Sequence, residues 1–335
     1  MDQIKFPTTV QIAGLKQKFR SYELSSGLES FDVLFGNSIP CSSLICIEEN
    51  NSKEYGELLC KYSIAEGIAN RHSIFIANCR GSTEDTILQK VPAKTSQTNL
   101  TDRRDLPAGD MKIAWRYNTA NQINSSLAKV HRFDIHDTLT DEEVANYPIK
   151  YFESSTSYKD LWAQIKEKVL ENQSLHNKKN VVRIIIKDIG LYDDPEFFLK
   201  FLQLLKLYTR DLHALIYLIV NTNGLPQYEQ EALLDISNAY FVLEAFASTK
   251  GFFDKFDGRL IIKRLPTITS AAQFKPVSVD LVFQKHKRYL DIRIFHLPPA
   301  LGAEDDVGAG GGCQSVSNGN KKAKMLGCGG AETQF

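Results

Sequence analysis

Short apolar runs of strand length alternate with segments of helical periodicity along the middle of this chain. Apolar residues recur at helical spacing over Tyr55–Asn70, between the strand-like runs Leu44–Ile47 and Ser73–Asn78. The same criteria then predict a helix at Tyr158–Asn172 capped by Ser157, a strand at Val181–Lys187, a helix at Pro195–Arg210, and strands at Leu215–Val220 and Phe241–Leu243. Strands separated by helices form βαβ units, so we expect an α/β fold with a mainly parallel sheet flanked by helices.

The end of this pattern differs, because three strand-like runs follow one another without intervening helices. They are Gly258–Leu265, Ser278–Phe283 and Tyr289–Phe295. In the last run, Leu290 and Ile292 alternate with charged residues, as expected of an antiparallel strand that is buried on one face. The parallel core is therefore expected to finish in a C-terminal antiparallel meander.

The helix expected at Pro195–Arg210 carries more apolar surface than contact with one sheet requires. Its Phe and Leu side chains lie on more than one face of the helix. They are Phe197, Phe198, Phe201, Leu202, Leu204, Leu205 and Leu207. We expect this helix to pack against the sheet and against a second surface.

Composition divides the chain into one large domain and two flanking segments. Residues 1–20 are expected to form an N-terminal extension, and residues 21–299 the folded domain, with an irregular, turn-rich insertion at about 91–148. Nine of the 20 glycines fall between Gly302 and the C-terminus. A segment so poor in apolar residues cannot offset its ordering entropy, so residues 300–335 are expected to form a disordered tail.

The overall composition is that of a soluble globular protein, with 43% hydrophobic and 24% charged residues. Lys and Arg balance Asp and Glu at 40 each, so a nucleic-acid contact would have to come from a local basic patch. No apolar run reaches the roughly 18 residues of a membrane helix, and no signal-peptide pattern opens the chain. The six cysteines form no CxxC pair and are expected to be buried, reduced thiols of a cytosolic or nuclear protein.

The turn after Leu44–Ile47 is the place where a nucleotide-binding protein of this kind carries its glycine-rich phosphate loop. Here the strand is followed by Glu48-Glu49-Asn50-Asn51, with no Gly-Lys-Ser/Thr, and the first glycine is Gly56. Carboxylates at this position repel phosphate. The segment before the strand, Ser26–Gly36 with Ile39-Pro40, resembles the lead-in of RecA-type ATPases. The sequence therefore suggests the frame of an ATPase without its main phosphate-binding element.

Three acidic residues are candidates for nucleotide chemistry, and each has a simpler interpretation. Asp188 follows the Val181–Lys187 strand, where an ATPase places its Mg²⁺-binding carboxylate, but it is also an ordinary polar residue turning into Gly190. Glu48 and Glu49 form either a general-base pair or, as we expect, acceptors for backbone N–H groups at the loop and helix start. No metal site is expected, because His131 and His136 lie in a polar loop without a second ligand cluster.

Two basic clusters are candidates for contact with a nucleic-acid backbone. Lys285, Lys287 and Arg288 occupy the expected tip of a hairpin, and a second cluster flanks the Leu260–Ile262 strand. The second cluster consists of Arg259, Lys263 and Arg264. An ordinary solvated turn or strand edge remains the alternative for both.

Several segments, in order along nearly the whole chain, resemble the PAXNEB family. The most distinctive is Met111-Lys112-Ile113-Ala114-Trp115-Arg116-Tyr117, which carries a Trp and two basic residues. The others are Ser26–Gly36 with Ile39-Pro40, Ile47-Glu48-Glu49, Leu59–Ile68, Gly258–Ile261 with Leu265-Pro266, Phe295–Pro299, and Gly327–Gly330. One departure is Asn37-Ser38, which replaces a glycine-rich turn usual before Ile-Pro.

The resemblance implies a RecA-like subunit of the Elongator complex that lacks the P-loop. Family members assemble with Elongator complex proteins five and six into a ring of six chains. The ring binds tRNA, responds to ATP, and docks on the catalytic Elongator subcomplex, which modifies the wobble uridine of tRNA anticodons. The resemblance thus implies an accessory, non-catalytic chain of the cytoplasm and nucleus, with no cofactor of its own and no membrane partner.

Two alternatives to this function stay open from the sequence. In the first, the chain is an ATPase subunit whose nucleotide site is completed by a neighbouring subunit, with ATP held at the subunit interface. In the second, it is an interaction scaffold without a nucleic-acid role.

Overall fold

The computed structural model describes residues 12–18, 21–51, 54–79, 87–95, 132–152, 157–167, 180–190, 195–246, 255–266 and 280–295. The motif at 111–117 and the tail expected at 300–335 lie outside these ranges. Within them, no helix is long and apolar enough to cross a membrane. Of the four described cysteines, all are free thiols, and Cys46, Cys60 and Cys79 are buried as expected, while Cys41 is half-buried.

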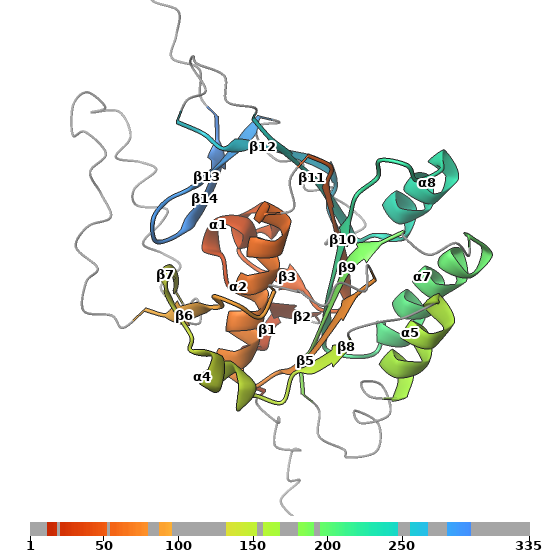
Figure 1. The fold of residues 1–335 in the computed structure, drawn as a ribbon, viewed down its shortest axis with the longest axis horizontal. Helices are drawn as coiled ribbons and strands as arrows, with labels where there is room; N and C mark the ends of the chain where they lie inside the picture. The colour runs from red at the N-terminus through yellow and green to blue at the C-terminus, as the bar shows by residue number, and fades with distance from the viewer. Residues whose placement is uncertain are drawn as a thin grey trace, which may run out of the picture. The chain divides into compact units, whose positions relative to one another are not determined.

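A nine-stranded mixed sheet forms the centre of the fold (Figure 1). Its strands are β4 (Ser43–Glu49), β5 (Ser73–Asn78), β8 (Lys150–Phe152), β9 (Val182–Ile189), β10 (Ala214–Val220), β11 (Ala239–Ala245), β12 (Gly258–Arg264), β13 (Leu281–Lys285) and β14 (Leu290–Ile294). They are ordered β14-β13-β12-β11-β4-β10-β9-β5-β8. Strands β11 to β8 pair in parallel and β12 to β14 pair antiparallel. This confirms the expected parallel core with an antiparallel end, the layout of RecA-like proteins.

Helices cover both faces of the sheet (Figure 1). One face carries α1 (Glu29–Asp32), the short helix η1 (Val33–Phe35) and α2 (Glu54–Asn70), which enclose one apolar cluster with the sheet. The other face carries α5 (Tyr158–Ile165), α7 (Pro195–Thr209) and α8 (Gln227–Ile236), which enclose a second cluster. Strands β9 and β10 are buried along their whole length, because helices lie on both sides of them.

The connections diverge at the carboxyl ends of β4 and β10, which are parallel neighbours, and the position beyond these two strand ends is called the crevice. The chain leaves β4 toward α2 on one face of the sheet and leaves β10 toward α8 on the other (Figure 1). Such a point, where connections diverge at the carboxyl ends of adjacent strands, is where open α/β sheets bind ligands. This crevice is therefore the first place to look for a functional site.

Some elements were not expected from the sequence. A small sheet is formed by β1 (Lys16–Lys18), β2 (Ser21–Leu24) and β3 (Ile39–Pro40). The region expected to be irregular contains the paired strands β6 (Pro92–Lys94) and β7 (Phe133–Thr138), and the helix α4 (Asp141–Ala145). The capping box of Thr140 and Glu143 opens α4 and is a signal that the sequence did contain. The expected irregularity of this region is wrong for these residues.

Candidate functional site

The sequence suggested that Glu48 and Glu49 lie in a turn after the strand. In the structure they are instead the last two residues of β4. Both residues are buried, with 6% and 2% of their surface exposed. Because successive side chains of a strand point to opposite faces, the two carboxylates enter the crevice from different sides. They therefore have separate partners and do not act as a pair.

Glu49 binds the N-terminus of helix α2. Its Oε2 accepts a hydrogen bond from the backbone N–H of Gly56 at 2.7 Å, and its Oε1 accepts one from Tyr55 N–H at 3.2 Å. The first N–H groups of a helix have no partner inside the helix, and the helix dipole favours an anion there. The expectation that this carboxylate accepts backbone hydrogen bonds is confirmed for Glu49.

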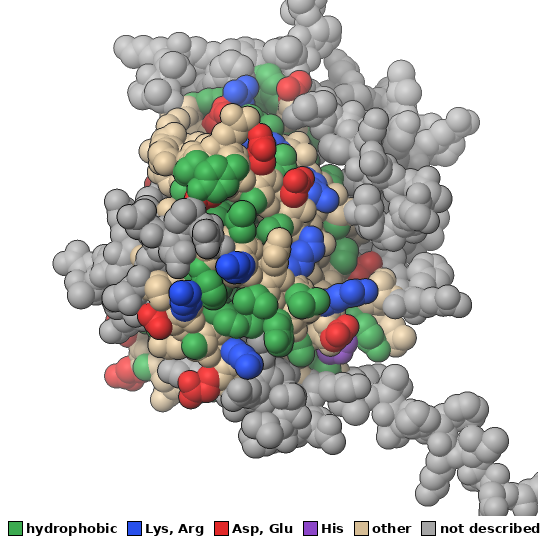
Figure 2. Space-filling model, turned by 90° about the vertical axis from the view of Figure 1, so that its right-hand side faces the viewer, with side chains coloured by type: hydrophobic (Ala, Val, Ile, Leu, Met, Phe, Trp, Pro, Cys, Tyr) green, Lys and Arg blue, Asp and Glu red, His purple; other side chains and the backbone are tan. Residues whose placement is uncertain are grey.

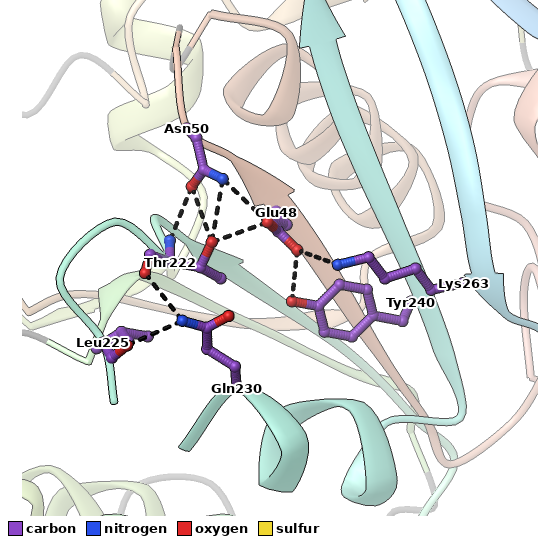
Figure 3. A network of polar contacts seen from close by, with 7 residues as sticks. All are labelled: Glu48, Asn50, Thr222, Leu225, Gln230, Tyr240 and Lys263. Carbon is purple, nitrogen blue, oxygen red and sulfur yellow. Dashed lines mark hydrogen bonds and ion pairs between the residues drawn. The ribbon is translucent and has the colours of Figure 1, made fainter. Parts of the chain in front are cut away.

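Glu48 instead lies in a network with side chains from strands β11 and β12 and from the loops after β4 and β10 (Figure 3). Its Oε1 accepts hydrogen bonds from Thr222 Oγ1 at 2.8 Å and from Asn50 Nδ2 at 2.9 Å. Its Oε2 accepts from the Tyr240 hydroxyl at 2.8 Å and from Lys263 Nζ at 3.0 Å. Both oxygens of Glu48 are thus fully engaged within the chain, and the prediction that it binds backbone donors is wrong.

These contacts fix the charge of the site. Burial raises the pKa of Glu48, but the hydrogen bonds from Thr222, Tyr240 and Lys263 outweigh burial, and the net pKa is lowered. Glu48 is therefore ionised at neutral pH. A general base needs a pKa near the working pH and a free oxygen, and Glu48 has neither.

Hydrogen bonds between Asn50 and Thr222 join the loop after β4 to the loop after β10 (Figure 3). Asn50 Oδ1 accepts a hydrogen bond from Thr222 N–H at 2.8 Å. The loop after β10 is held in turn by α8, because Gln230 Nε2 donates to the carbonyl of Leu225 at 2.8 Å. The crevice between β4 and β10 is therefore closed by hydrogen bonds within the chain.

A pocket of about 260 Å³ remains beside this network. Its lining combines two carboxylates and one ammonium with amide and apolar side chains. The residues are Glu48, Asn50, Asn51, Asn223, Val242, Leu243, Glu244, Ile261 and Lys263. Two acidic groups against one basic group make this pocket a poor site for phosphate.

Asp188 lies inside β9, where its backbone has a φ of 53°, and its side chain is 8% exposed. This left-handed conformation interrupts the alternation of the strand, and the β9–β10 register shifts nearby. Strands β9 and β4 are separated by β10. By strand spacing, the backbones of Asp188 and Glu48 are thus roughly 10 Å apart.

The cluster of Arg259, Lys263 and Arg264 lies within β12, on the α8 side of the sheet. Arg259 pairs with Glu244, and Lys263 pairs with Glu48. Arg264 donates to the backbone carbonyls of Leu234 and Asp235, which are at the end of α8. Cations at a helix C-terminus complement its dipole, so this Arg has a structural role.

The cluster of Lys285, Lys287 and Arg288 lies at the β13–β14 hairpin tip, as expected, on the side of α2 and β7. Lys285 pairs with Glu54 at the start of α2, and Arg288 Nε lies 3.7 Å from the Asp134 carboxylate in β7. Lys287 is exposed and has no ion-pair partner among the described residues. The six basic residues therefore form two separate groups and not one patch.

Sequence reasoning missed several members of the central network. Thr222 and Tyr240 lie 174 and 192 positions from Glu48 along the chain, and neither belongs to a recognisable motif. Only the sheet order, which places β10 and β11 on either side of β4, brings them together. In the described residues, no group of three or more His, Cys, Asp or Glu side chains is placed to hold a metal ion.

Fold and site together define an α/β protein of RecA-like layout whose switch-point crevice is filled by its own side chains and lacks a phosphate loop. A family model described as "PAXNEB protein" matches residues 9–327, so the chain belongs to the PAXNEB family.

Three relatives align with this chain along most of their own length. The chain is 24% identical to Elongator complex protein 4 of Danio rerio (93% of this chain, 92% of the relative) and 26% identical to that of Mus musculus (94% and 89%). It is 25% identical to that of Schizosaccharomyces pombe (90% and 91%). Among solved structures, a KaiC-like protein of Pyrococcus horikoshii aligns with 81% of this chain and 98% of its own at 12% identity, with a TM-score of 0.46.

Proposed function

We propose that this protein is an accessory, non-catalytic subunit of the Elongator complex, which supports wobble-uridine modification of tRNA anticodons. Its membership of the PAXNEB family and its full-length similarity to proteins named Elongator complex protein 4 support this proposal. The chemistry of the modification then belongs to another chain of the complex.

The observation that carries the non-catalytic role is the closed crevice. Glu48 and Glu49 fill the switch point from its two sides, and each accepts hydrogen bonds from the chain itself. A phosphate placed there would meet two buried carboxylates and would have to break the bonds that join Asn50 to Thr222. The chain alone is thus unsuited to hold a nucleotide at the place where its fold would bind one.

The proposal includes assembly with Elongator complex proteins five and six into a ring of six chains. Figure 2 shows the face formed by α5, α7 and α8, where hydrophobic side chains lie among Lys and Arg. Leu207 and Tyr208 of α7 are 61% and 46% exposed, and Tyr208 packs edge-on against Trp162 of α5. Exposed apolar surface of this kind is typical of protein contacts, and we propose that a partner subunit is the second surface against which α7 packs.

The proposal also includes tRNA binding, with the β13–β14 hairpin as the contact. Lys287 is unpaired in the described residues, and the pairs made by Lys285 and Arg288 are partly exposed to solvent. Exposed ion pairs contribute little free energy, so these two cations can exchange a carboxylate for a phosphate. Each cation of the second cluster, Arg259, Lys263 and Arg264, already binds a carboxylate or a backbone carbonyl, and we place this cluster second.

Co-expression with the two partner subunits tests the proposal. We expect a complex whose mass corresponds to two copies of each chain and which binds tRNA. A chain that stays monomeric with both partners present would refute the assembly. ATP hydrolysis by the complex that is lost in both Glu48→Ala and Asp188→Ala would refute the non-catalytic role and support a nucleotide site completed by a neighbour.

A further inference from the structure

The N-terminus of helix α2 already holds an anion, and that anion is a side chain of the protein. Glu49 comes from the end of β4, and its carboxylate reaches the N–H groups of Tyr55 and Gly56 in the first turn of α2. With 2% of its surface exposed, Glu49 excludes solvent from this position.

The lack of a side chain at Gly56 lets the Glu49 carboxylate approach the start of α2 closely. A Cβ atom at this position would lie 2.8 Å from Glu49 Oε2, closer than van der Waals contact permits. The residue has no unusual backbone angle that would require glycine for another reason. The glycine therefore serves the close approach of an oxygen anion to the helix N–H groups, as glycines do in loops that hold phosphate.

We propose that Glu49 is an internal substitute for a ligand phosphate, which closes the α2 anion site against phosphates and keeps the crevice ordered without nucleotide. The excluded ligands are tetrahedral oxyanions, namely inorganic phosphate, pyrophosphate and the phosphate groups of nucleotides. The proposal concerns the isolated fold and does not depend on assignment to the Elongator complex.

The geometry has a clear consequence when the carboxylate is removed. In Glu49→Ala, the N–H groups of Tyr55 and Gly56 lose their acceptor, and the positive end of a 17-residue helix is left without an anion. The vacated space lies against those donors and suits a small oxyanion. An added anion then takes over the role of the missing side chain.

Thermal unfolding of the full chain, alone and with inorganic pyrophosphate, tests this proposal. Sodium chloride at matched ionic strength controls for the general effect of salt. The wild-type Tm is expected to respond equally to pyrophosphate and chloride. Glu49→Ala is expected to lower Tm by about 4 °C, and pyrophosphate is expected to restore most of that loss with a saturable dose dependence.

Two further variants keep the test decisive. Glu54→Ala removes a carboxylate from the same helix end without emptying the site, so it should show no specific response to pyrophosphate. Glu49→Gln keeps an acceptor oxygen for one N–H, so it should fold if Glu49→Ala does not and show a weaker rescue. Saturable stabilisation of the wild type by pyrophosphate would overturn the proposal, as would the absence of rescue in both Glu49 variants.

Discussion

Arg183 Nε donates a hydrogen bond to His72 Nδ1 across 3.0 Å, with both side chains almost wholly buried. Because an arginine N–H can only donate, Nδ1 must be the unprotonated nitrogen of the imidazole. His72 Nε2 then carries the proton and donates it to the carbonyl of Ala13 at 2.8 Å. The imidazole is therefore neutral, and it connects the N-terminal segment to strand β9.

Two substitutions of His72 separate its roles. His72→Ala leaves a buried guanidinium N–H without an acceptor, so we expect the free energy of unfolding to fall by about 2–4 kcal/mol. His72→Asn places an amide oxygen near the position of Nδ1, so its loss should be clearly smaller. Urea denaturation measures both, and equal losses would contradict the acceptor role of Nδ1.

Asp32 gives the fold an unusual dependence on pH. Burial raises the pKa of Asp32 from 3.8 to about 6, against hydrogen bonds from Ser25 and Ser26 that lower it. The folded state therefore holds this proton more tightly than the unfolded state. Its contribution to stability is complete below pH 3.8 and is lost as the pH rises through 6, with a total of about 3 kcal/mol.

The variant Asp32→Asn isolates this contribution from that of other acids, such as Glu48, whose lowered pKa acts in the opposite direction. Between pH 4 and pH 7, the free energy of unfolding of the wild type should fall by about 2.4 kcal/mol relative to the variant. Chemical denaturation at several pH values gives this difference. A difference that does not change with pH would show that Asp32 titrates at its ordinary pKa.

Two buried tyrosines provide a matched pair of hydroxyl deletions. The Tyr240 hydroxyl donates to ionised Glu48, so Tyr240→Phe should lower the free energy of unfolding by about 1.5–3 kcal/mol. The Tyr217 hydroxyl is buried without a hydrogen-bond partner among the described residues. Tyr217→Phe should be neutral or stabilising, and comparable losses in the two variants would contradict the importance of the Glu48 network.

The strand–helix alternation predicted the parallel core because burial on both faces requires continuous apolar runs, such as Leu215–Val220. It did not predict α8, whose ten residues bury only Glu229 and Leu233. Nor did it predict that β4 continues through Glu48 and Glu49, because two adjacent carboxylates suggest an exposed turn. Their burial depends on donors from Gly56, Thr222 and Tyr240.

Arg183 is a buried cation whose hydrogen-bond acceptors could not be predicted from the sequence, just as the donors to Glu48 and Glu49 could not. In the sequence it is a charged residue inside an apolar strand, and only the structure reveals its acceptors, which are Ser25 O, Ser63 Oγ and His72 Nδ1. These partners are 111 to 158 positions away along the chain. Local patterns indicate which residues are buried, but not which distant polar groups compensate them.

The exposed face of α7 gives a prediction about assembly. Leu207→Glu replaces an apolar side chain that is 61% exposed, so the stability of the isolated chain should change by less than about 0.5 kcal/mol. Co-purification with the two partner subunits should nevertheless weaken strongly. Gln203→Glu adds the same charge one turn away on the same helix, and equal weakening by this control would point to charge and not to apolar contact.

The hairpin tip gives the prediction about tRNA. Lys287 has no competing carboxylate in the described residues, so Lys287→Ala should weaken tRNA binding by the assembled complex and lower the slope of log K against log salt by about one unit. Lys285→Ala and Arg288→Ala should each have a smaller effect, because their cations are already partly neutralised by Glu54 and Asp134.

Charge reversal sharpens this test. Lys285→Glu, Lys287→Glu and Arg288→Glu combined should abolish binding at low salt, whereas Arg264→Ala, on the other side of the sheet, should leave the affinity unchanged. Binding is measured by titration at several salt concentrations. If the triple reversal retained the wild-type affinity while Arg264→Ala lost it, the contact would lie on the α8 side, where β12 carries the other three cations.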